Sequence, residues 1–442
     1  MASTAKPHLG SDLAALVGAE NVCEESAPLT AFAVDGVRPE VWVVPGNVEE
    51  VAAIVRIANE QKLTLTVAGG FSHQSMGNVP TSVDILLRMD RLNHVLHFDP
   101  GDLTIGAESG CKVGDIQKKV FADSLMLPLE PTKAQQGTVG GALATASAGP
   151  LKHGFGGARE YCIGVSFVTG DGRVAKAGGR VVKNVAGYDL MKLMIGSQGT
   201  LGVITSANFK LFPAPKQTRT FVAEFESCEA ALRYRDFVQR SPLTPMCLEL
   251  ISSRAHSYLD GSDEERWAIA VRGAGSDAVL ARFRKELGAN VLRELEGQDE
   301  SRFWLALQGF SGTVQKRHQN AMSMTLHVVP AELGSVLKSA EQCGVEQNML
   351  FACIGRAGVA SMTAVFVPLS VDPPSVMQYA TAIGDLRKRM PRDSAAIVTR
   401  CPREAKAYFS VWGETSSDVE AMRAVKRALD PNGILNRGRF LF

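Results

Sequence analysis

The chain has 442 residues, enough for two or three domains of ordinary size. Hydrophobic residues make up 45% and charged residues 21% of the chain, a balance that excludes a disordered or fibrous protein. Lysine and arginine total 47 against 46 acidic residues, and the net charge of +1 gives no support for a nucleic-acid binder or a polybasic membrane-surface protein.

The first residues and the cysteines bear on the cellular compartment. The start, MASTAKPHLG, has no apolar run behind its single lysine, so we expect no cleaved secretory signal. No stretch approaches the roughly 18 apolar residues of a transmembrane helix. The eight cysteines are scattered without a C-x-x-C pair, which predicts reduced thiols rather than disulfides or a zinc site. We therefore expect a soluble cytoplasmic protein.

Residues 41–70 predict one β-α-β unit. Residues 41–44 form a short apolar run. Asn47 and Glu50 have the spacing of a helix N-cap and its capping-box partner. Residues 63–67 are a β-branched run that stops at two glycines.

We expect further strands and one more helix before residue 213. The turn at 169–172 holds two glycines between apolar runs, which is typical of a hairpin because glycine tolerates positive φ. Mixed strands with interleaved helices make this half of the chain α+β. The strands are expected at 84–87, 104–107, 163–169 and 201–211, and the helix at 113–121.

Two prolines at 213 and 215 predict a linker. The elements beyond it follow the order strand, helix, strand, strand, helix, which predicts a small antiparallel sheet with helices on one face. No internal repeat is visible in the sequence. The elements are expected at 220–225, 228–240, 248–251, 267–271 and 277–287, with a last helix at 417–429.

One feature of this second half resembles a dinucleotide fingerprint. Gly273 and Gly275 follow the run at 267–271, but Ala278 stands where a third glycine belongs. We interpret this segment as an ordinary turn from strand to helix, not as a nicotinamide site.

A glycine-rich loop follows the strand expected at 63–67. It reads GGFSHQSMG over residues 69–77. Without Cβ atoms the backbone can approach a ligand closely, and consecutive amide groups can form a concavity that binds anions. The alternative is a plain Gly-Gly turn.

A second segment, residues 136–149, consists almost entirely of small residues. Small side chains let a backbone touch a flat ligand, and Thr138 and Thr145 could supply hydroxyl groups. The alternative is a tightly packed helix crossing. Two such segments in one domain indicate a large ligand that carries a diphosphate and spans both.

Three segments carry a family resemblance. Residues 181–204 closely resemble the PCMH-type FAD-binding domain of the vanillyl-alcohol oxidase superfamily, and they are most similar to the FAD-binding subunits of bacterial glycolate oxidases. Residues 138–142 resemble the second FAD loop of that family. Residues 429–439 are similar to its terminal D-P-x-G-I-x-N-P-G motif, with Arg437 in place of the proline.

The resemblance implies an α+β flavoprotein with two lobes. Residues 1–36 would be an N-terminal segment and 37–213 the FAD-binding domain. Residues 216–400 would form a ferredoxin-like α+β cap over the isoalloxazine and bind the substrate. Residues 401–442 would return to the FAD domain and close its site.

The resemblance also implies which residues hold FAD, which we expect to be bound non-covalently. A covalent bond to His73 is the alternative, because some superfamily members attach FAD through a histidine near this position. Val67, Ala68 and Phe71 depart from the family pattern of an arginine before the glycines and a small residue after them. The implied FAD-binding residues are Ala68, Gly69, Gly70, Phe71, Ser72, His73, Thr138, Val139, Gly140, Gly141, Thr145, Gly202, Val203 and Ile204.

The resemblance implies hydride transfer from the carbinol carbon of a 2-hydroxy acid, such as glycolate or D-lactate, to the flavin. A base must take the hydroxyl proton, and an arginine or lysine should bind the carboxylate. Related enzymes carry a metal-binding H-x-G-D-G-N-x-H stretch; here residues 353–360 have Cys353 and Ala360 in place of the histidines, so we expect no metal. The sequence does not identify the base. The candidates for the base and for the carboxylate-binding cation together are Arg302, Arg317, His318, Arg356 and Arg400.

Two functions remain open at this point. In the first, the chain is an FAD-carrying subunit that assembles with a catalytic flavoprotein subunit and an iron–sulfur subunit, since its cysteines lack the spacing for an iron–sulfur cluster. Such partners could also bring it to a membrane. In the second, it is a stand-alone FAD-dependent dehydrogenase or oxidase of another alcohol or hydroxy acid. A flavin-free binding protein of the same fold is a third, non-enzymatic possibility.

Overall fold

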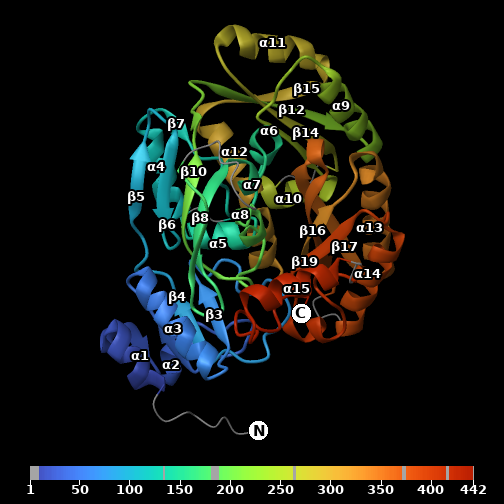
Figure 1. The fold of residues 1–442 in the computed structure, drawn as a ribbon. Helices are drawn as coiled ribbons and strands as arrows, with labels where there is room; N and C mark the ends of the chain where they lie inside the picture. The colour runs from blue at the N-terminus through green and yellow to red at the C-terminus, as the bar shows by residue number, and fades with distance from the viewer. Residues whose placement is uncertain are drawn as a thin grey trace. The chain divides into compact units, whose positions relative to one another are not determined.

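The computed structural model describes residues 9–132, 135–180, 189–261, 265–370, 375–414 and 418–441. The chain divides into two compact units (Figure 1). The first unit contains residues 1–147, 157–213 and 415–442, and the second contains 148–156 and 214–414. The chain passes from the first to the second unit within the proline segment predicted as a linker. The short excursion of residues 148–156 into the second unit was not predicted.

The first unit contains a four-stranded sheet with the order β1-β2-β4-β3. β2 and β3 both pair in parallel with β4, and α3 connects them, so the predicted β-α-β unit is confirmed with β4 inserted between its strands. Asn47 caps α3 as predicted: its Oδ1 accepts from the Glu50 amide at 2.8 Å. The elements are β1 (Val22–Cys23), β2 (Val41–Val43), α3 (Val48–Glu60), β3 (Leu65–Ala68) and β4 (Ile85–Arg88).

The first unit also contains a five-stranded antiparallel sheet of order β5-β6-β10-β8-β9 and a two-stranded pairing of β7 (Leu125–Met126) with β11 (Phe212–Pro213). The predicted hairpin joins β8 to β9, and Gly172 has the positive φ that such a turn favours, +82°. The elements are β5 (Val95–Asp99), β6 (Thr104–Glu108), α4 (Val113–Phe121), α5 (Val139–Ala144), β8 (Cys162–Val168), β9 (Val174–Gly178) and β10 (Val203–Lys210).

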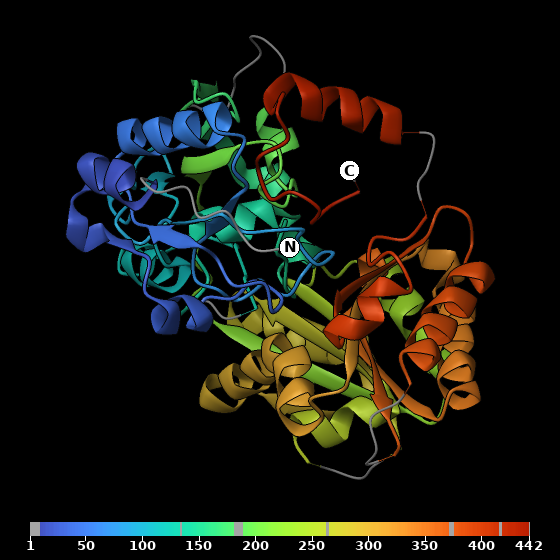
Figure 2. The same ribbon diagram turned by 90° about the horizontal axis from the view of Figure 1, so that it is seen from below.

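The C-terminal residues from 415 on belong to the first unit, whereas residues 401–414, which we also expected to return there, belong to the second. Helix α15 (Val419–Leu429), red in Figure 2, lies in this unit and leads into a turn; Ser417, where we expected the helix to begin, lies outside the described residues. The buried Asp430 carboxylate accepts from the amides of Ile434 and Leu435 at 3.0 and 2.9 Å. The chain then runs parallel to β3, where the Leu65 amide donates to the Ile434 carbonyl at 2.9 Å.

The described part of the second unit contains an eight-stranded antiparallel sheet, larger than the small sheet predicted, with the order β15-β12-β14-β13-β17-β18-β16-β19. The Gly273 region is part of β14, paired antiparallel on both sides, so it is not the parallel β-α-β unit of a dinucleotide fold. The strands are β12 (Thr218–Phe225), β13 (Cys247–Ile251), β14 (Trp267–Ala274), β15 (Val291–Leu295), β16 (Met322–His327), β17 (Met349–Arg356), β18 (Ser361–Pro368) and β19 (Ala395–Arg400).

This sheet is a duplication that the sequence does not reveal. Each half follows the order β-α-β-β-α-β of a ferredoxin-like unit. The sheet orders β15-β12-β14-β13 and β17-β18-β16-β19 mirror each other, because within each half the fourth strand lies beside the first and the third beside the second. The second strands of the two halves, β13 and β17, pair antiparallel and join the halves into one sheet. The helices are α9 (Cys228–Arg240), α11 (Asp277–Leu287), α13 (Leu333–Glu346) and α14 (Val376–Arg389).

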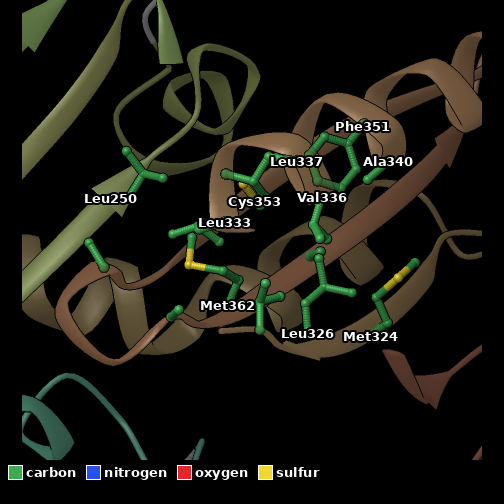
Figure 3. Close-up of a cluster of buried hydrophobic side chains, with 14 of the residues drawn as sticks. Leu250, Met324, Leu326, Leu333, Val336, Leu337, Ala340, Phe351, Cys353 and Met362 are labelled. Carbon is green, nitrogen blue, oxygen red and sulfur yellow. The ribbon is translucent and has the colours of Figure 1, made fainter. Parts of the chain in front are cut away.

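Different helices cover the two faces of this sheet. Figure 3 shows α13 packing Leu333, Val336 and Leu337 toward strand residues that include Cys353 and Met362. The long helix α12 (Gly297–Arg317) packs on the opposite face, where the Trp304 indole donates to the Thr220 hydroxyl at 2.8 Å. The two helices predicted for this sheet, α9 and α11, pack into the same hydrophobic core as α13, so they lie on one face as predicted; α12, which was not predicted, links the two halves across the other face.

All eight cysteines are free. Among the described residues, no helix is both long and apolar enough to span a membrane.

A buried polar network attaches α12 to the sheet. Glu300 is 3% exposed and accepts from the Thr220 hydroxyl at 2.7 Å and from Arg272 Nε at 3.2 Å. The Thr218 hydroxyl donates to the same carboxylate. We predict that Glu300→Ala lowers the free energy of unfolding by about 3 kcal/mol, because it leaves the partly buried Arg272 and the hydroxyls of Thr218 and Thr220 without their acceptor. Urea unfolding monitored by tryptophan fluorescence measures the change.

The neighbouring Asp299 provides a matched control on the same helix. Its ion pair with Arg302 has side chains 74% and 76% exposed, so Asp299→Ala should leave the unfolding midpoint almost unchanged. If both variants lost the same free energy of unfolding, the buried network around Glu300 would not stabilise the packing of α12 on the sheet.

Candidate functional site

A cavity in the first unit lies among the loop after β3, the start of α5, the turn before β10 and the C-terminal segment. These elements are far apart in the sequence and all belong to one unit. The lining residues are Val67, Gly69, Gly70, Phe71, Ser72, His73, Gln74, Met76, Met89, Ser109, Thr138, Gly140, Gly141, Ala144, Thr145, Gln198, Gly199, Gly202, Ile204, Asn436 and Arg439.

The glycines of the two loops are required by contacts between the loops. A Cβ atom on Gly70 would lie 1.6 Å from the Gln136 carbonyl oxygen, and one on Gly69 would lie 2.2 Å from the Thr138 hydroxyl. Both distances are shorter than any real contact, so no side chain fits at either position. The sequence analysis attributed these glycines to the close approach of a ligand, whereas the structure shows that their missing side chains bring the two loops together.

The structure brings most of the predicted site residues together. Eleven of the fourteen line the cavity, and Ala68, Val139 and Val203 are instead buried in hydrophobic clusters directly beside lining residues. These three belong to elements whose neighbouring residues face the cavity. Part of the motif that carried the family resemblance, residues 181–188, lies outside the described residues.

The two predicted threonine hydroxyls are not equally available. Thr138 is the N-cap of α5, and its Oγ1 accepts from the Gly141 amide at 3.2 Å, which leaves its own proton free to be donated. The Thr145 hydroxyl donates to the Gly141 carbonyl at 2.8 Å and also meets Ser147 Oγ at 2.7 Å. Thr145 thus stabilises the end of α5, and Thr138 is the better placed of the two to contact a ligand.

Arg439 holds the first loop in place from the C-terminal segment. Its Nη2 donates to the carbonyls of Gln74, at 2.6 Å, and Met76, and its Nη1 reaches the Asn78 carbonyl at 3.4 Å. The loop amide of Asn78 donates in return to the Arg439 carbonyl at 3.0 Å. One buried guanidinium therefore organises residues 74–78.

Two polar atoms of the lining are buried without a hydrogen bond to any described residue. They are Ser109 Oγ and Asn436 Oδ1. Asn436 is positioned by its other atoms, because its Nδ2 donates to the Gln198 carbonyl at 2.7 Å and its amide to the Leu65 carbonyl at 2.9 Å. Buried polar atoms normally have partners, so these two atoms indicate a polar ligand in the cavity.

The electrostatics of the cavity suit an anion. Among its described lining residues there is no aspartate or glutamate, whereas Arg439 and His73 are present. Burial lowers the pKa of Arg439 to about 10, partly offset by Asp35, so the guanidinium stays charged at neutral pH. Burial also lowers the pKa of His73, whose Nδ1 lies 3.0 Å from Ser72 Oγ, and so favours a neutral imidazole.

Sequence reasoning missed several lining residues, namely Ser109, Gln198, Gly199, Asn436 and Arg439. The terminal N-x-G-x motif was a usable signal for Asn436 and Arg439, since both lie within the segment that resembled the family. No local pattern distinguishes Ser109, whose role depends on the Gly140 backbone packing over it: a Cβ on Gly140 would lie 2.8 Å from the Ser109 Cβ.

The five catalytic candidates all lie in the second unit, outside this cavity. Arg302 and Arg400 are exposed, and Arg317 donates to the Ser257 carbonyl at 2.6 Å. His318 Nε2 lies 3.3 Å from the Tyr258 hydroxyl. Arg356 differs because it is buried and donates to two backbone carbonyls. The described contacts single out none of the five as a base.

The stretch at the metal-binding position of related enzymes forms the end of β17 and the turn into β18. Cys353 is fully buried in the hydrophobic core, and burial raises the pKa of its thiol. In the described ranges, no group of three or more histidine, cysteine, aspartate or glutamate side chains is arranged to hold a metal ion.

Two family profiles match the chain. One is described as an FAD binding domain and matches residues 39–178, and the other is described as the C-terminal domain of FAD linked oxidases and matches residues 406–440. Together they cover both glycine loops and the segment that carries Asn436 and Arg439.

Named proteins are similar along much of the chain. D-lactate dehydrogenase of Archaeoglobus fulgidus is 34% identical over 412 residues, which is 90% of each chain. Glycolate oxidase subunit GlcE of Escherichia coli is 30% identical over 256 residues, 58% of this chain and 66% of that protein. The structure of p-cresol methylhydroxylase aligns with a TM-score of 0.75 at 16% identity, covering 98% of this chain and 96% of that one, which shows a shared fold.

These findings define the class as flavoprotein oxidoreductases of the two-lobed α+β fold that the sequence predicted. The chain belongs to the FAD-linked oxidase family; it is an FAD-dependent oxidoreductase acting on CH–OH groups. The cavity fits FAD, since the diphosphate suits glycine-loop amides without nearby carboxylates, and the two unpartnered buried oxygens suit polar groups of the cofactor.

We predict that Gly70→Ala weakens FAD binding tenfold or more, because the added methyl group would force the loops apart. Titration of the apoprotein with FAD, followed by flavin fluorescence, measures the dissociation constant. Gly179→Ala is the matched control in the same unit, since a Cβ there meets nothing within 4 Å. Unchanged affinity in Gly70→Ala would mean that the contact between the loops does not shape the FAD site.

We also predict that Arg439→Lys weakens FAD binding and lowers the free energy of unfolding by about 2 kcal/mol. A single ammonium group cannot replace the fork of a guanidinium that donates to several carbonyls at once. Arg437→Lys is the control, because Arg437 bonds only carbonyls of its own turn among the described residues. Equal FAD affinities in the two variants would contradict the role assigned to Arg439.

Proposed function

We propose that the chain oxidises a small 2-hydroxy acid, such as glycolate or D-lactate, to the corresponding 2-oxo acid. The single observation that carries the proposal is the 34% identity with a D-lactate dehydrogenase over nine-tenths of both chains. The glycolate oxidase subunit supports the same chemistry, because glycolate and lactate both carry a hydroxyl group on the carbon next to a carboxylate.

The residues of the cavity have a definite part in this reaction. When bound, FAD supplies the acceptor for the hydride that leaves the carbinol carbon. Its polar groups can form hydrogen bonds with Ser109 Oγ, Asn436 Oδ1 and the Thr138 hydroxyl. Arg439 holds the first loop in place beside it. His73 lines the cavity beside Ser72, where it can contact FAD, and we propose that it does so without a covalent bond.

We further propose that the chain works as one subunit of a complex with a catalytic flavoprotein subunit and an iron–sulfur subunit. The support is its similarity to a protein named as a glycolate oxidase subunit. Electrons accepted by a flavin must leave through an oxidant, and the cysteines here are too scattered to ligate a cluster.

The alternative is an enzyme that acts alone on a 2-hydroxy acid or another alcohol. It is favoured by the D-lactate dehydrogenase, which this chain matches over 90% of its length. The two proposals differ in whether a 2-hydroxy acid can reduce the flavin of the isolated chain without partner subunits.

Anaerobic reduction of the flavin tests these proposals. We predict a yellow protein whose flavin is released by acid precipitation, and whose absorbance bleaches with glycolate or D-lactate rapidly only when partner subunits are present. Rapid bleaching of the pure chain would favour the stand-alone enzyme. Flavin that stays in the acid pellet would contradict non-covalent binding, and a lack of bleaching by any 2-hydroxy acid in either preparation would contradict the substrate class.

A further inference from the structure

Phe71, in the first loop of the cavity, has a backbone conformation that aromatic residues rarely adopt. Its φ is +55°, in the left-handed region, where a Cβ atom crowds the backbone. A glycine would adopt the same conformation without strain, and the family pattern has a small residue at this position. Strained residues persist only where their surroundings hold them, so the contacts of the Phe71 side chain must compensate for the strain.

The ring of Phe71 is held by Phe32. The two ring centroids lie 4.8 Å apart, and the ring planes are tilted by 47°. At this separation two aromatic rings attract each other beyond the effect of burial alone. Phe32 directly follows the short helix α2 (Ser26–Ala31). Both rings also pack against a small buried cluster, which consists of Val34, Ala68, Val83 and Leu86.

Phe32 is in turn fixed to the four-stranded sheet by Arg88. The guanidinium carbon of Arg88, at the end of β4, lies 4.5 Å from the centre of the Phe32 ring and 4.9 Å from that of Trp42 on β2. The negative face of an aromatic ring attracts a cation in this position. Asp90 Oδ2 accepts from Arg88 Nε at 3.0 Å and so orients the guanidinium. Two strands of the sheet therefore set the position of Phe32.

A tight turn anchors the segment that carries Phe32. The Val34 amide donates to the Val37 carbonyl at 2.9 Å, and the Val37 amide donates to the Val34 carbonyl at 3.0 Å. The two residues between them, Asp35 and Gly36, have φ values of +51° and +78°, the signs of a type I′ turn. Because Val34 is fully buried in the cluster that both rings contact, this turn keeps Phe32 beside the first loop.

We propose that Phe32 is a positioning residue of the FAD site. Its ring keeps Phe71 in the left-handed conformation, and a left-handed residue within a loop lets successive amides converge on an anion such as a diphosphate. Phe32 is not among the described residues that line the cavity, so it acts on the cofactor only through Phe71. This inference concerns the cofactor rather than the substrate and so goes beyond the proposed function.

Two substitutions of Phe71 separate the backbone conformation from the ring. Phe71→Ala keeps the strain and loses the ring, so it should weaken FAD binding about tenfold. Phe71→Gly also loses the ring but removes the strain, so it should bind FAD more tightly than Phe71→Ala. Titration of each apoprotein with FAD, followed by flavin fluorescence, measures the dissociation constants. An equal or greater loss in Phe71→Gly would show that FAD binding depends on the ring itself, and the proposal would fail.

The role of Phe32 is tested in two backgrounds by the same titration. In the natural chain, Phe32→Ala should weaken FAD binding about tenfold, because Phe71 loses its support. In the Phe71→Gly variant the same substitution should have a much smaller effect, because a glycine needs no support in the left-handed conformation. Phe121→Ala is the matched control: Phe121 is 69% exposed at the end of α4 in the same unit, and its removal should leave FAD binding unchanged.

The double variant distinguishes positioning from a general contribution to the fold. If the losses from Phe32→Ala and Phe71→Gly simply add, Phe32 does not act through Phe71 and the positioning role is wrong. Far-UV circular dichroism of each apoprotein checks that it folds. Should Phe32→Ala not fold, Phe32→Leu keeps an apolar side chain in the cluster without the ring, and a loss of FAD affinity in the natural chain alone is again expected. None of these titrations contains a 2-hydroxy acid, so their result is independent of the proposed function.

Discussion

The first unit depends on the contact between its two glycine loops. The Gln136 carbonyl occupies the space where a side chain of residue 70 would be, so the loops can meet only because that residue is glycine. From this contact follow the placement of Thr138 beside Gly69, the packing of Gly140 over Ser109 and the shape of the FAD cavity. The direct effect of these glycines is to let the two loops pack together, and the shape of the cofactor site follows from that packing.

The C-terminal segment completes what the loops begin. Asp430 folds the turn by accepting two amides, the chain then extends the sheet beside β3, and Asn436 and Arg439 reach the cavity from there. The bonds that hold this segment end on backbone amides and carbonyls. Most of its side chains could therefore change without breaking them. Its functional residues are Asn436 and Arg439, whose side chains line the cavity.

Much of this was predictable from sequence. The capped helix after Asn47 and the helices at 113–121, 228–240 and 277–287 were found because caps and apolar spacing are local signals. The duplicated sheet was not found, because its two halves share topology without visible sequence similarity. Most FAD-loop residues were predicted from glycine patterns and resemblance, whereas Ser109 reaches the cavity only because β6 pairs with β10, a contact between segments far apart in the sequence.

The order of the segments along the chain has a consequence for how the protein acquires its cofactor. The first unit is assembled from three stretches, and the last of them follows the entire second unit in sequence. During translation the duplicated sheet can therefore form while the wall carrying Asn436 and Arg439 is still missing. The FAD cavity is complete only after Asn436 and Arg439 have been synthesised, so we expect a chain stalled before residue 430 to hold FAD more weakly than the full chain.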